Sequence, residues 1–277
     1  VFCVTPFFQF EPKGEDLKED KIFSRQEQKI TDGKYTLFFE TNGEVEDLPE
    51  KKETYFYRYD ECDGRRENGT ASAVYQMKKS VKPGEETDLT LIYSLDSQIN
   101  MEAKSLFDKM KEAQIHYQEK LIKTSGLRNE LAQILVCSAD KFLSKRESTD
   151  GLTILAGFPF FEDWGRDTMI ALPGICISTG RFENAKSIMR TFAFYEKDGL
   201  MPNLFPEGGN KPLYNTVDAA LLFINCVWLY YEKTQEIEFV EEMYPVMQRI
   251  ICGYEKGTHF NIHMEEDGLI SAGTGLD

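Results

Sequence analysis

Residues 89–123 read LTLIYSLDSQINMEAKSLFDKMKEAQIHYQEKLIK, and within them the spacing of apolar side chains changes from that of a strand to that of a helix. Residues 89–94 are rich in β-forming side chains. After Ser94 the apolar residues recur at roughly helical spacing, at Leu106, Met110, Ile115 and Leu121. The change predicts a β domain over residues 1–98, a linking helix over 99–126 and a helical domain over 127–277.

Before this stretch, short β-rich runs alternate with turn signals. The runs are residues 34–39, 54–59, 73–77 and 89–94, and the turn signals are Asp32-Gly33, Asn42-Gly43, Asp63-Gly64 and Pro83-Gly84. Short strands separated by tight turns are typical of antiparallel sheets, so we expect an antiparallel β-sandwich.

After this stretch, the apolar pattern predicts five further helices, in antiparallel pairs joined by loops. They are expected near residues 127–143, 166–179, 182–196, 216–233 and 238–255. Pro245 lies inside the last of these and predicts either an internal kink or a boundary. Residues 263–270 are expected to form a small hairpin. The fold class is therefore α+β.

The composition excludes several classes of function. The chain of 277 residues has 32 basic and 47 acidic side chains, for a formal charge of −15. A nucleic-acid surface needs clustered positive charge, which this balance disfavours. No apolar run reaches the roughly 18–20 residues that cross a bilayer, and the first residues do not resemble a signal peptide. We therefore expect a cytoplasmic protein whose six cysteines are reduced thiols.

The densest group of chemically useful side chains is residues 157–168, GFPFFEDWGRDT. Arginine can hold two oxygens at once, a carboxylate accepts hydrogen bonds from hydroxyls, and an aromatic ring offers a flat apolar face. Trp164, Arg166 and Asp167 would together suit a polyhydroxylated ring. The alternative is a structural ion pair between Arg166 and Asp167 near a helix start.

Two later loops carry similar chemistry. In residues 199–207, GLMPNLFPE, two prolines flank Asn203, whose amide suits hydroxyl groups, although the pattern alone favours a rigid loop in which Asn203 caps its own backbone. In residues 214–220, YNTVDAA, Asn215 or Thr216 could be a helix N-cap. Asp218 would then lie in the first turn, either binding a ligand or compensating the helix dipole.

Other kinds of site have little support in the sequence. His259 and His263 have the i, i+4 spacing of zinc ligands, but no Glu adjoins the first and the segment is not predicted to be helical. Neither a P-loop nor a GxGxxG motif occurs, and no local motif marks a Ser or Cys nucleophile. We expect no metal and no cofactor.

Three ordered blocks carry a resemblance to a known family. Residues 161–168 (FEDWGRDT), with 171–174 (ALPG) and 179–182 (TGRF), resemble the amylo-α-1,6-glucosidase domain of glycogen debranching enzymes. Residues 199–206 and 214–219 are similar to the next blocks of that family, in the same order and at the same spacing. The resemblance covers about residues 150–277, and the β-rich part resembles the N-terminal sandwich of bacterial and archaeal forms less specifically.

The resemblance implies an (α/α)6 toroid that hydrolyses α-1,6-linked glucose at the branch points of glycogen or limit dextrin, with inversion. It carries a glucose-holding role onto Trp164, Arg166 and Asp167. From the neighbouring blocks it carries substrate binding onto Asn203, Asn215 and Asp218.

The resemblance also implies that the chain lacks the proton-transfer residues. In the family, a Thr-Trp-Met-Asp segment with the general acid should follow residues 272–277 (AGTGLD), and the base lies further on. Asp277 itself does not occupy the position of the acid. The first Met is Met77, and a closed toroid needs twelve helices. We therefore expect a truncated domain at both ends.

Two alternatives remain open at the level of sequence. One is another toroid glycosidase, similar to a glucoamylase or a trehalase. The other is a non-catalytic glycan-binding protein, which the expected lack of proton-transfer carboxylates would suit. The sequence makes no prediction of oligomeric state.

Overall fold

The computed structural model describes residues 1–11, 15–62, 64–157, 161–205 and 211–272. Four predictions fall partly outside these ranges. They are the turn at Asp63-Gly64, the aromatic residues at 158–160, the Pro206-Glu207 end of the second loop, and the block at 272–277 that includes Asp277.

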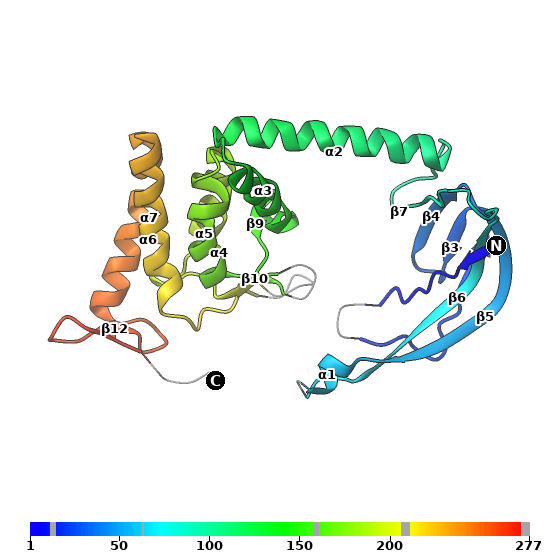
Figure 1. Cartoon of the computed structure of the whole chain (residues 1–277). Coiled ribbons are helices and arrows are strands. Elements are labelled where there is room, and N and C mark those ends of the chain that lie inside the picture. Colours follow the sequence, from blue (N-terminus) through cyan, green and yellow to red (C-terminus); the bar gives the residue numbers. More distant parts are fainter. Residues whose placement is uncertain (12–14, 63, 158–160, 206–210, 273–277) are drawn as a thin grey trace. The chain divides into compact units, whose positions relative to one another are not determined.

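The chain divides into two compact units, Val1–Ile115 and His116–Asp277. The boundary falls within the long helix α2 (Ala103–Ser125), which confirms the helix predicted between the β-rich and helical parts. Each unit has its own apolar core (Figure 1).

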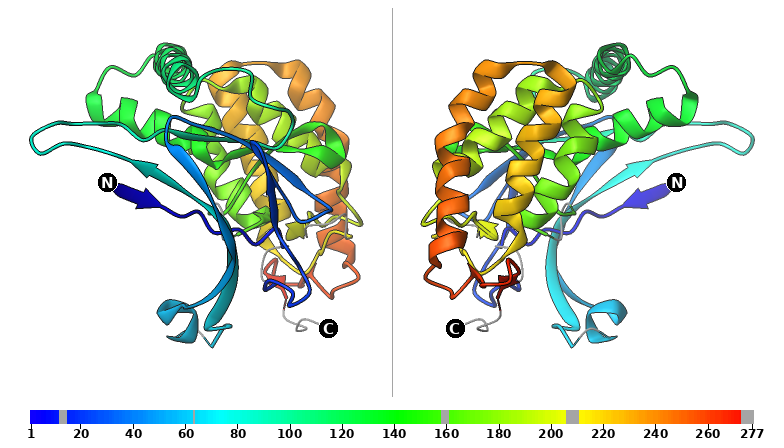
Figure 2. Two further views of the ribbon diagram at one scale, coloured as in Figure 1. Left: turned by 90° about the vertical axis from the view of Figure 1, so that its right-hand side faces the viewer. Right: turned by 90° about the vertical axis from the view of Figure 1, so that its left-hand side faces the viewer.

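The first unit contains two antiparallel sheets, with strand orders β1-β6-β5 and β2-β3-β4-β7. Their strands are β1 (Phe2–Val4), β2 (Ser24–Gln26), β3 (Lys29–Thr31), β4 (Thr36–Thr41), β5 (Glu44–Phe56), β6 (Asn68–Lys79) and β7 (Leu91–Ser94). β5 and β6 form a long bent hairpin (Figure 2). The antiparallel arrangement predicted from the turn signals is confirmed.

Side chains from both sheets meet in one core. The ring of Phe39 on β4 stacks on Tyr75 of β6, with centroids 4.7 Å apart. Ile30 of β3 and Met77 of β6 are fully buried beside them. Tyr75 and Met77 are two residues apart on β6, so they lie on the same face of the strand, toward this core.

One strand was predicted in the wrong place. Residues 54–59 were expected to be a strand, but β5 begins ten residues earlier and ends at Phe56, and α1 (Arg58–Cys62) follows. The pairing of β5 with β6 ends where Phe56 lies opposite Asn68. The early part of β5 carries many charges, and it is a strand because of this pairing rather than its own propensity.

The second unit is mainly helical, as predicted. Its helices are α3 (Glu130–Ala139), α4 (Gly165–Leu172), α5 (Phe182–Phe194), α6 (Asp218–Thr234) and α7 (Ile237–Lys256). Three two-stranded antiparallel sheets accompany them: β8 (Leu143–Arg146) with β9 (Gly151–Ile154), β10 (Asp163–Trp164) with β11 (Leu204–Phe205), and β12 (His263–Met264) with β13 (Ile270–Ser271). The last pair is the predicted hairpin; the other two pairs were not predicted.

Two helix boundaries differ from the predictions. The helix expected over residues 166–179 ends at Leu172 and continues as one turn of π-helix, Pro173–Ile177, because Pro173 cannot donate an intrahelical hydrogen bond. Pro245 marks no boundary, since α7 runs through it. Pro245 is exposed, and so is Glu241, whose carbonyl loses its helical partner there and can be hydrated.

Helices α4 to α7 lie side by side around the second core, and each contributes fully buried side chains (Figures 1 and 2). Met169, Ile188, Phe223 and Ile250 are examples from the four helices. Since successive helices run in opposite directions, the starts of α4 and α6 lie at the same end as the ends of α5 and α7 (Figure 1). The candidate site is at this end. In the described residues, no helix is long and apolar enough to span a membrane.

Candidate functional site

A buried ion pair anchors the segment that carries the first candidate residues. The carboxylate of Asp163 on β10 is almost fully buried and accepts hydrogen bonds from Nε of Arg146, at 3.1 Å, and from Oγ1 of Thr168, at 3.2 Å. Thr153 of β9 also donates to it. Burial raises the pKa of the Asp163 carboxyl, and the Arg146 charge opposes this shift. This network fixes the start of α4 to β8 and β9.

A close backbone contact joins this segment to the second loop. The N–H of Gly165 donates to the carbonyl of Asn203 at 2.8 Å, and Trp164 pairs with Leu204 between β10 and β11. A Cβ atom on residue 165 would lie 2.0 Å from the carbonyl oxygen of Pro202. Residue 165 must therefore be glycine for the loop to lie against the start of α4.

The centre of the site is an ion pair between the first turns of two helices. Nε of Arg166, on α4, donates to Oδ2 of Asp218, on α6, at 2.6 Å. Nη2 of Arg166 lies 3.3 Å from Oγ1 of Thr216, which donates to Oδ1 of Asp218 at 2.8 Å. The side chain of Arg166 is 55% exposed and that of Asp218 is 41% exposed, so both charges remain open to a ligand.

The environment of Asp218 keeps its carboxylate ionised. Partial burial would raise the pKa of Asp218, but the hydrogen bonds from Arg166 and Thr216 outweigh it and lower the pKa below its ordinary value. The hydroxyl of Tyr254, near the end of α7, donates to the carbonyl of Val217 and so holds the start of α6. Burial raises the pKa of Tyr254 to about 12. Asp218 is therefore a fixed hydrogen-bond acceptor.

The structure corrects two expectations about these residues. Arg166 pairs with Asp218 and not with Asp167, so the alternative of a local ion pair is wrong. The residue that precedes α6 is Val217, and neither Asn215 nor Thr216 caps the helix. The hydroxyl of Thr216 bonds to Asp218 instead, while Asp218 itself lies in the first turn, as expected.

Asp167 and Trp164 flank the pair. Asp167 is exposed in the first turn of α4, and Trp164 is half-buried at the end of β10. Among the described residues, neither the Asp167 carboxylate nor the Trp164 ring has a hydrogen-bonding or ion-pair partner. Trp164, Arg166 and Asp167 are therefore all at least partly exposed to solvent.

The two asparagines bond to each other. Nδ2 of Asn203 donates to Oδ1 of Asn215 at 3.0 Å, and both side chains are half-buried. Asn203 adjoins Gly165 through the backbone bond described above, and Asn215 precedes Thr216. The six predicted residues thus gather into two bonded pairs, with Trp164 and Asp167 beside Arg166. The anchoring role of Asp163 was not predicted, because its partners come from other parts of the sequence.

This arrangement can hold a neutral, hydroxyl-rich ligand. Arg166 offers guanidinium N–H donors, Asp167 and Asp218 offer carboxylate acceptors, and the asparagine amides offer both. The two histidines with i, i+4 spacing have separate partners: His259 lies 3.8 Å from Asp198 and His263 lies 3.1 Å from Glu265. The described residues contain no group of three or more possible metal ligands.

Comparison with known proteins points to the same part of the chain. The family model described as "Amylo-alpha-1,6-glucosidase" matches residues 137–277, slightly more than half of the chain and including all six site residues. The chain is also similar to the glycogen debranching enzyme of Saccharomyces cerevisiae (strain ATCC 204508 / S288c), with 38% identity over 113 residues. That match covers 37% of this chain and 7% of the yeast protein.

Proposed function

We propose, from the premise that the chain belongs to the amylo-α-1,6-glucosidase family, that it provides the glucose-holding side of a site that hydrolyses α-1,6-linked glucose at the branch points of glycogen or limit dextrin. The observation that carries the proposal is the open ion pair of Arg166 and Asp218, beside Asp167 and Trp164. Such a group of donors, acceptors and one aromatic ring suits a terminal glucose unit.

The fold proposal follows the same family. We propose that the helices of residues 127–277 belong to an (α/α)6 toroid, and that residues 1–98 form a β-sandwich domain linked by residues 99–126. The antiparallel order of α4 to α7 and their common core support the toroid. The shared core of the two sheets supports the sandwich. A cytoplasmic location stays a prediction from the composition.

Each site residue has a distinct role in this proposal. Arg166 donates to hydroxyl oxygens of glucose through the guanidinium N–H groups that Asp218 does not engage. Asp167 accepts hydrogen bonds from other hydroxyls, because its carboxylate is exposed and has no partner among the described residues. Trp164 covers the C–H face of the ring. Asn203 and Asn215 form the adjoining wall through their mutual bond.

Neither Asp218 nor Asp163 is suited to proton transfer. A general acid must be protonated near the working pH, whereas Arg166 and Thr216 hold the pKa of Asp218 low. Asp163 is buried and its carboxylate accepts hydrogen bonds from Arg146 and two threonines. Inversion requires two carboxyl groups about 6.5–9.5 Å apart with water between them. We assign these roles to carboxyl groups other than the residues of this site.

The test is release of free glucose from a limit dextrin by a polypeptide that contains this chain, before and after Asp167→Ala. Loss of glucose release and of glucose affinity is expected, with Asp150→Ala, an exposed carboxylate outside the site, as the control. If Asp167→Ala changes neither activity nor affinity, the site assignment is wrong.

A substrate panel on the same protein tests the reaction. Hydrolysis confined to α-1,4 links or to trehalose would replace the proposal with a glucoamylase-like or trehalase-like activity. Glucan binding without any hydrolysis would replace it with a glycan-binding function.

A further inference from the structure

Several polar groups of the candidate site come from one short segment, residues 214–218. Asn215, Thr216 and Asp218 all lie within it. Its first four residues, 214–217, lie outside the helices and strands of the structure, and Asp218 begins α6. Regular secondary structure therefore does not fix the backbone of this segment, and the geometry of the site depends on what else holds it.

A tyrosine hydroxyl holds the first end of the segment. The hydroxyl of Tyr214 donates to the carbonyl of Tyr195, at the end of α5, at 2.7 Å. The ring of Tyr195 packs edge-on against Phe205 of β11, with centroids 5.0 Å apart. Because Tyr214 adjoins Asn215, this bond sets where the side chain of Asn215 meets that of Asn203.

A second tyrosine hydroxyl holds the other end. The residue before α6 is Val217, whose apolar side chain cannot cap the helix, so the first turn needs another restraint. The hydroxyl of Tyr254, which is buried near the end of α7, donates to the carbonyl of Val217. Asp218 follows Val217 directly, so this bond places the Asp218 carboxylate against Arg166.

Both hydroxyls remain hydrogen-bond donors at neutral pH. Burial raises the pKa of Tyr214, and it raises the pKa of Tyr254 to about 12. Neither phenol loses its proton near neutral pH. The two bonds are therefore permanent restraints and not pH switches.

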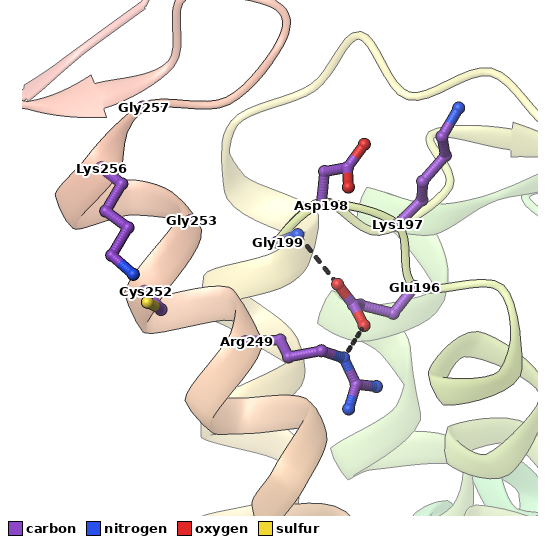
Figure 3. A pocket seen from close by; sticks show the side chains of 9 residues that line it. All are labelled: Glu196, Lys197, Asp198, Gly199, Arg249, Cys252, Gly253, Lys256 and Gly257. Carbon is purple, nitrogen blue, oxygen red and sulfur yellow. Dashed lines mark hydrogen bonds and ion pairs between the residues drawn. The ribbon is translucent and has the colours of Figure 1, made fainter.

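The ends of α5 and α7, to which the two bonds lead, are themselves joined. Glu196 follows Tyr195, and its side chain is only 2% exposed. Its Oε1 accepts from the N–H of Gly199 at 2.8 Å, and its Oε2 accepts from Nε of Arg249 at 2.5 Å (Figure 3). Because Arg249 lies on α7, this buried carboxylate ties the turn after α5 to that helix.

A backbone contact supports the same junction. A Cβ atom on Gly253 would lie 2.9 Å from Cα of Gly199, so the turn after α5 and the end of α7 touch directly. Gly253 is followed by Tyr254. The carbonyl of Tyr195 and the hydroxyl of Tyr254 therefore belong to one rigid frame, which holds both ends of residues 214–218.

We propose that Tyr214 and Tyr254 are positioning residues of the candidate site. Their hydroxyls tie residues 214–218 to the ends of α5 and α7, and so set the separation of the polar groups that this segment carries. The inference rests on the proposed function, because these polar groups are the ones assigned to glucose. Neither tyrosine needs to touch the ligand.

The variant Tyr254→Phe removes one hydroxyl and leaves the buried ring in place. The first turn of α6 then loses a restraint, and the bond between Arg166 and Asp218 loosens. The pKa of Asp218 is expected to rise toward the ordinary aspartate value, and glucose affinity to fall about fivefold. NMR titrations of the Asp218 carboxyl carbon with acid, and of the chain with glucose, measure the two effects. Wild-type values for both would overturn the role of Tyr254.

Tyr230→Phe is the matched control for that variant. Tyr230 is also a buried tyrosine, and it lies on α6, but its hydroxyl donates to Glu236 at the other end of the helix. The control should lower the midpoint of urea unfolding, as Tyr254→Phe does, yet leave the pKa of Asp218 and the glucose affinity unchanged. Equal shifts of both quantities in the two variants would show that lost stability alone explains them, and the proposal would be wrong.

Tyr214→Phe tests the first end of the segment with a different signal. The side-chain amide of Asn203 donates to Asn215 at 3.0 Å, so its NMR resonances report how the two side chains meet. These resonances are expected to shift in Tyr214→Phe, and glucose affinity to fall about fivefold. The pKa of Asp218 should stay near its wild-type value, because Tyr254 still holds that end. Unchanged Asn203 resonances together with unchanged glucose affinity would overturn the role of Tyr214.

The two proposals fail in different ways. If the phenylalanine variants shift the Asp218 and Asn203 signals while Arg166→Met leaves glucose affinity unchanged, the glucose site is wrong and the positioning roles stand. If Arg166→Met weakens glucose binding while Tyr214→Phe and Tyr254→Phe both behave as the wild type, only the positioning roles are wrong.

Discussion

The Nε atom of Arg166 and the Oδ2 atom of Asp218 lie 2.6 Å apart, although 52 positions separate the two residues in the sequence. The pair joins the first turns of α4 and α6 at the end of the helical unit. Exposed ion pairs contribute only about 0–1 kcal/mol to stability. A role in holding a ligand accounts better for two charges that are aligned and yet open to solvent.

The first prediction concerns the ionisation of Asp218. A carboxyl whose pKa is lowered in the folded protein contributes stability above its unfolded pKa and loses it as the pH falls through the folded value. Asp218 should therefore stay ionised below the ordinary aspartate range, and Arg166→Met should raise its pKa because the main opposing hydrogen bond is lost.

Carbon-detected NMR of the carboxyl groups measures this directly. Asp150, whose pKa is lowered by Lys145, is the internal control and should titrate alike in both proteins. An identical titration midpoint for Asp218 in the wild type and in Arg166→Met would show that the ion pair does not set its charge.

The second prediction concerns the contact between Gly165 and Pro202. Gly165→Ala would place Cβ 2.0 Å from a backbone oxygen that cannot rotate away. The helical unit should lose about 1–3 kcal/mol, toward the upper end, and glucose binding should weaken because the loop of Asn203 is displaced. Urea unfolding followed by tryptophan fluorescence reports this unit, since Trp164 and Trp228 are the two tryptophans of the chain.

Gly174→Ala is the matched control for that substitution. Gly174 also lies in a helical segment, but no neighbouring group among the described residues would come within 4 Å of a Cβ atom placed there. The substitution should be neutral or stabilising by up to about 1 kcal/mol. Equal stability of the two variants would mean that the close approach to Pro202 does not matter.

The third prediction concerns the buried pair of Arg146 and Asp163. Their side chains are 15% and 2% exposed. Arg146→Met leaves the Asp163 carboxylate without its main partner and should cost about 3–5 kcal/mol. Lys145→Met, next in sequence and in an exposed pair with Asp150, should cost less than about 1 kcal/mol. Urea unfolding followed by tryptophan fluorescence measures the free energy of unfolding of both variants. A similar loss of stability in Arg146→Met and Lys145→Met would rule out an anchoring role for Arg146.

Features that follow from local pattern were predicted from the sequence. The helices around Met169, Ile188, Phe223 and Ile250 are visible as apolar periodicity, because one face of each must be buried. The turns of the first unit are marked by Gly, Asn and Asp. The six proposed site residues were selected because their side chains suit one kind of ligand and lie in ordered blocks, and the structure brings four of them into two bonded pairs.

Features that depend on distant partners were not predicted. The charged part of β5 is a strand only because β6 pairs with it, and the sequence of residues 44–53 does not indicate this. The partner of Arg166 could not be identified, since Asp167 is adjacent while Asp218 is brought near by folding. The strands β10 and β11 have two residues each, too few to show a period, and about 40 residues separate them in the sequence.

The most direct test of the central claim is the affinity of the chain for glucose, measured by NMR titration, in the wild type and in Arg166→Met. Arg190→Met is the control, because Arg190 forms an equally exposed pair with Glu242, at 2.7 Å, outside the site. Binding that weakens about tenfold or more in Arg166→Met alone is the expected result. Equal glucose affinity in Arg166→Met and the wild type would contradict the account.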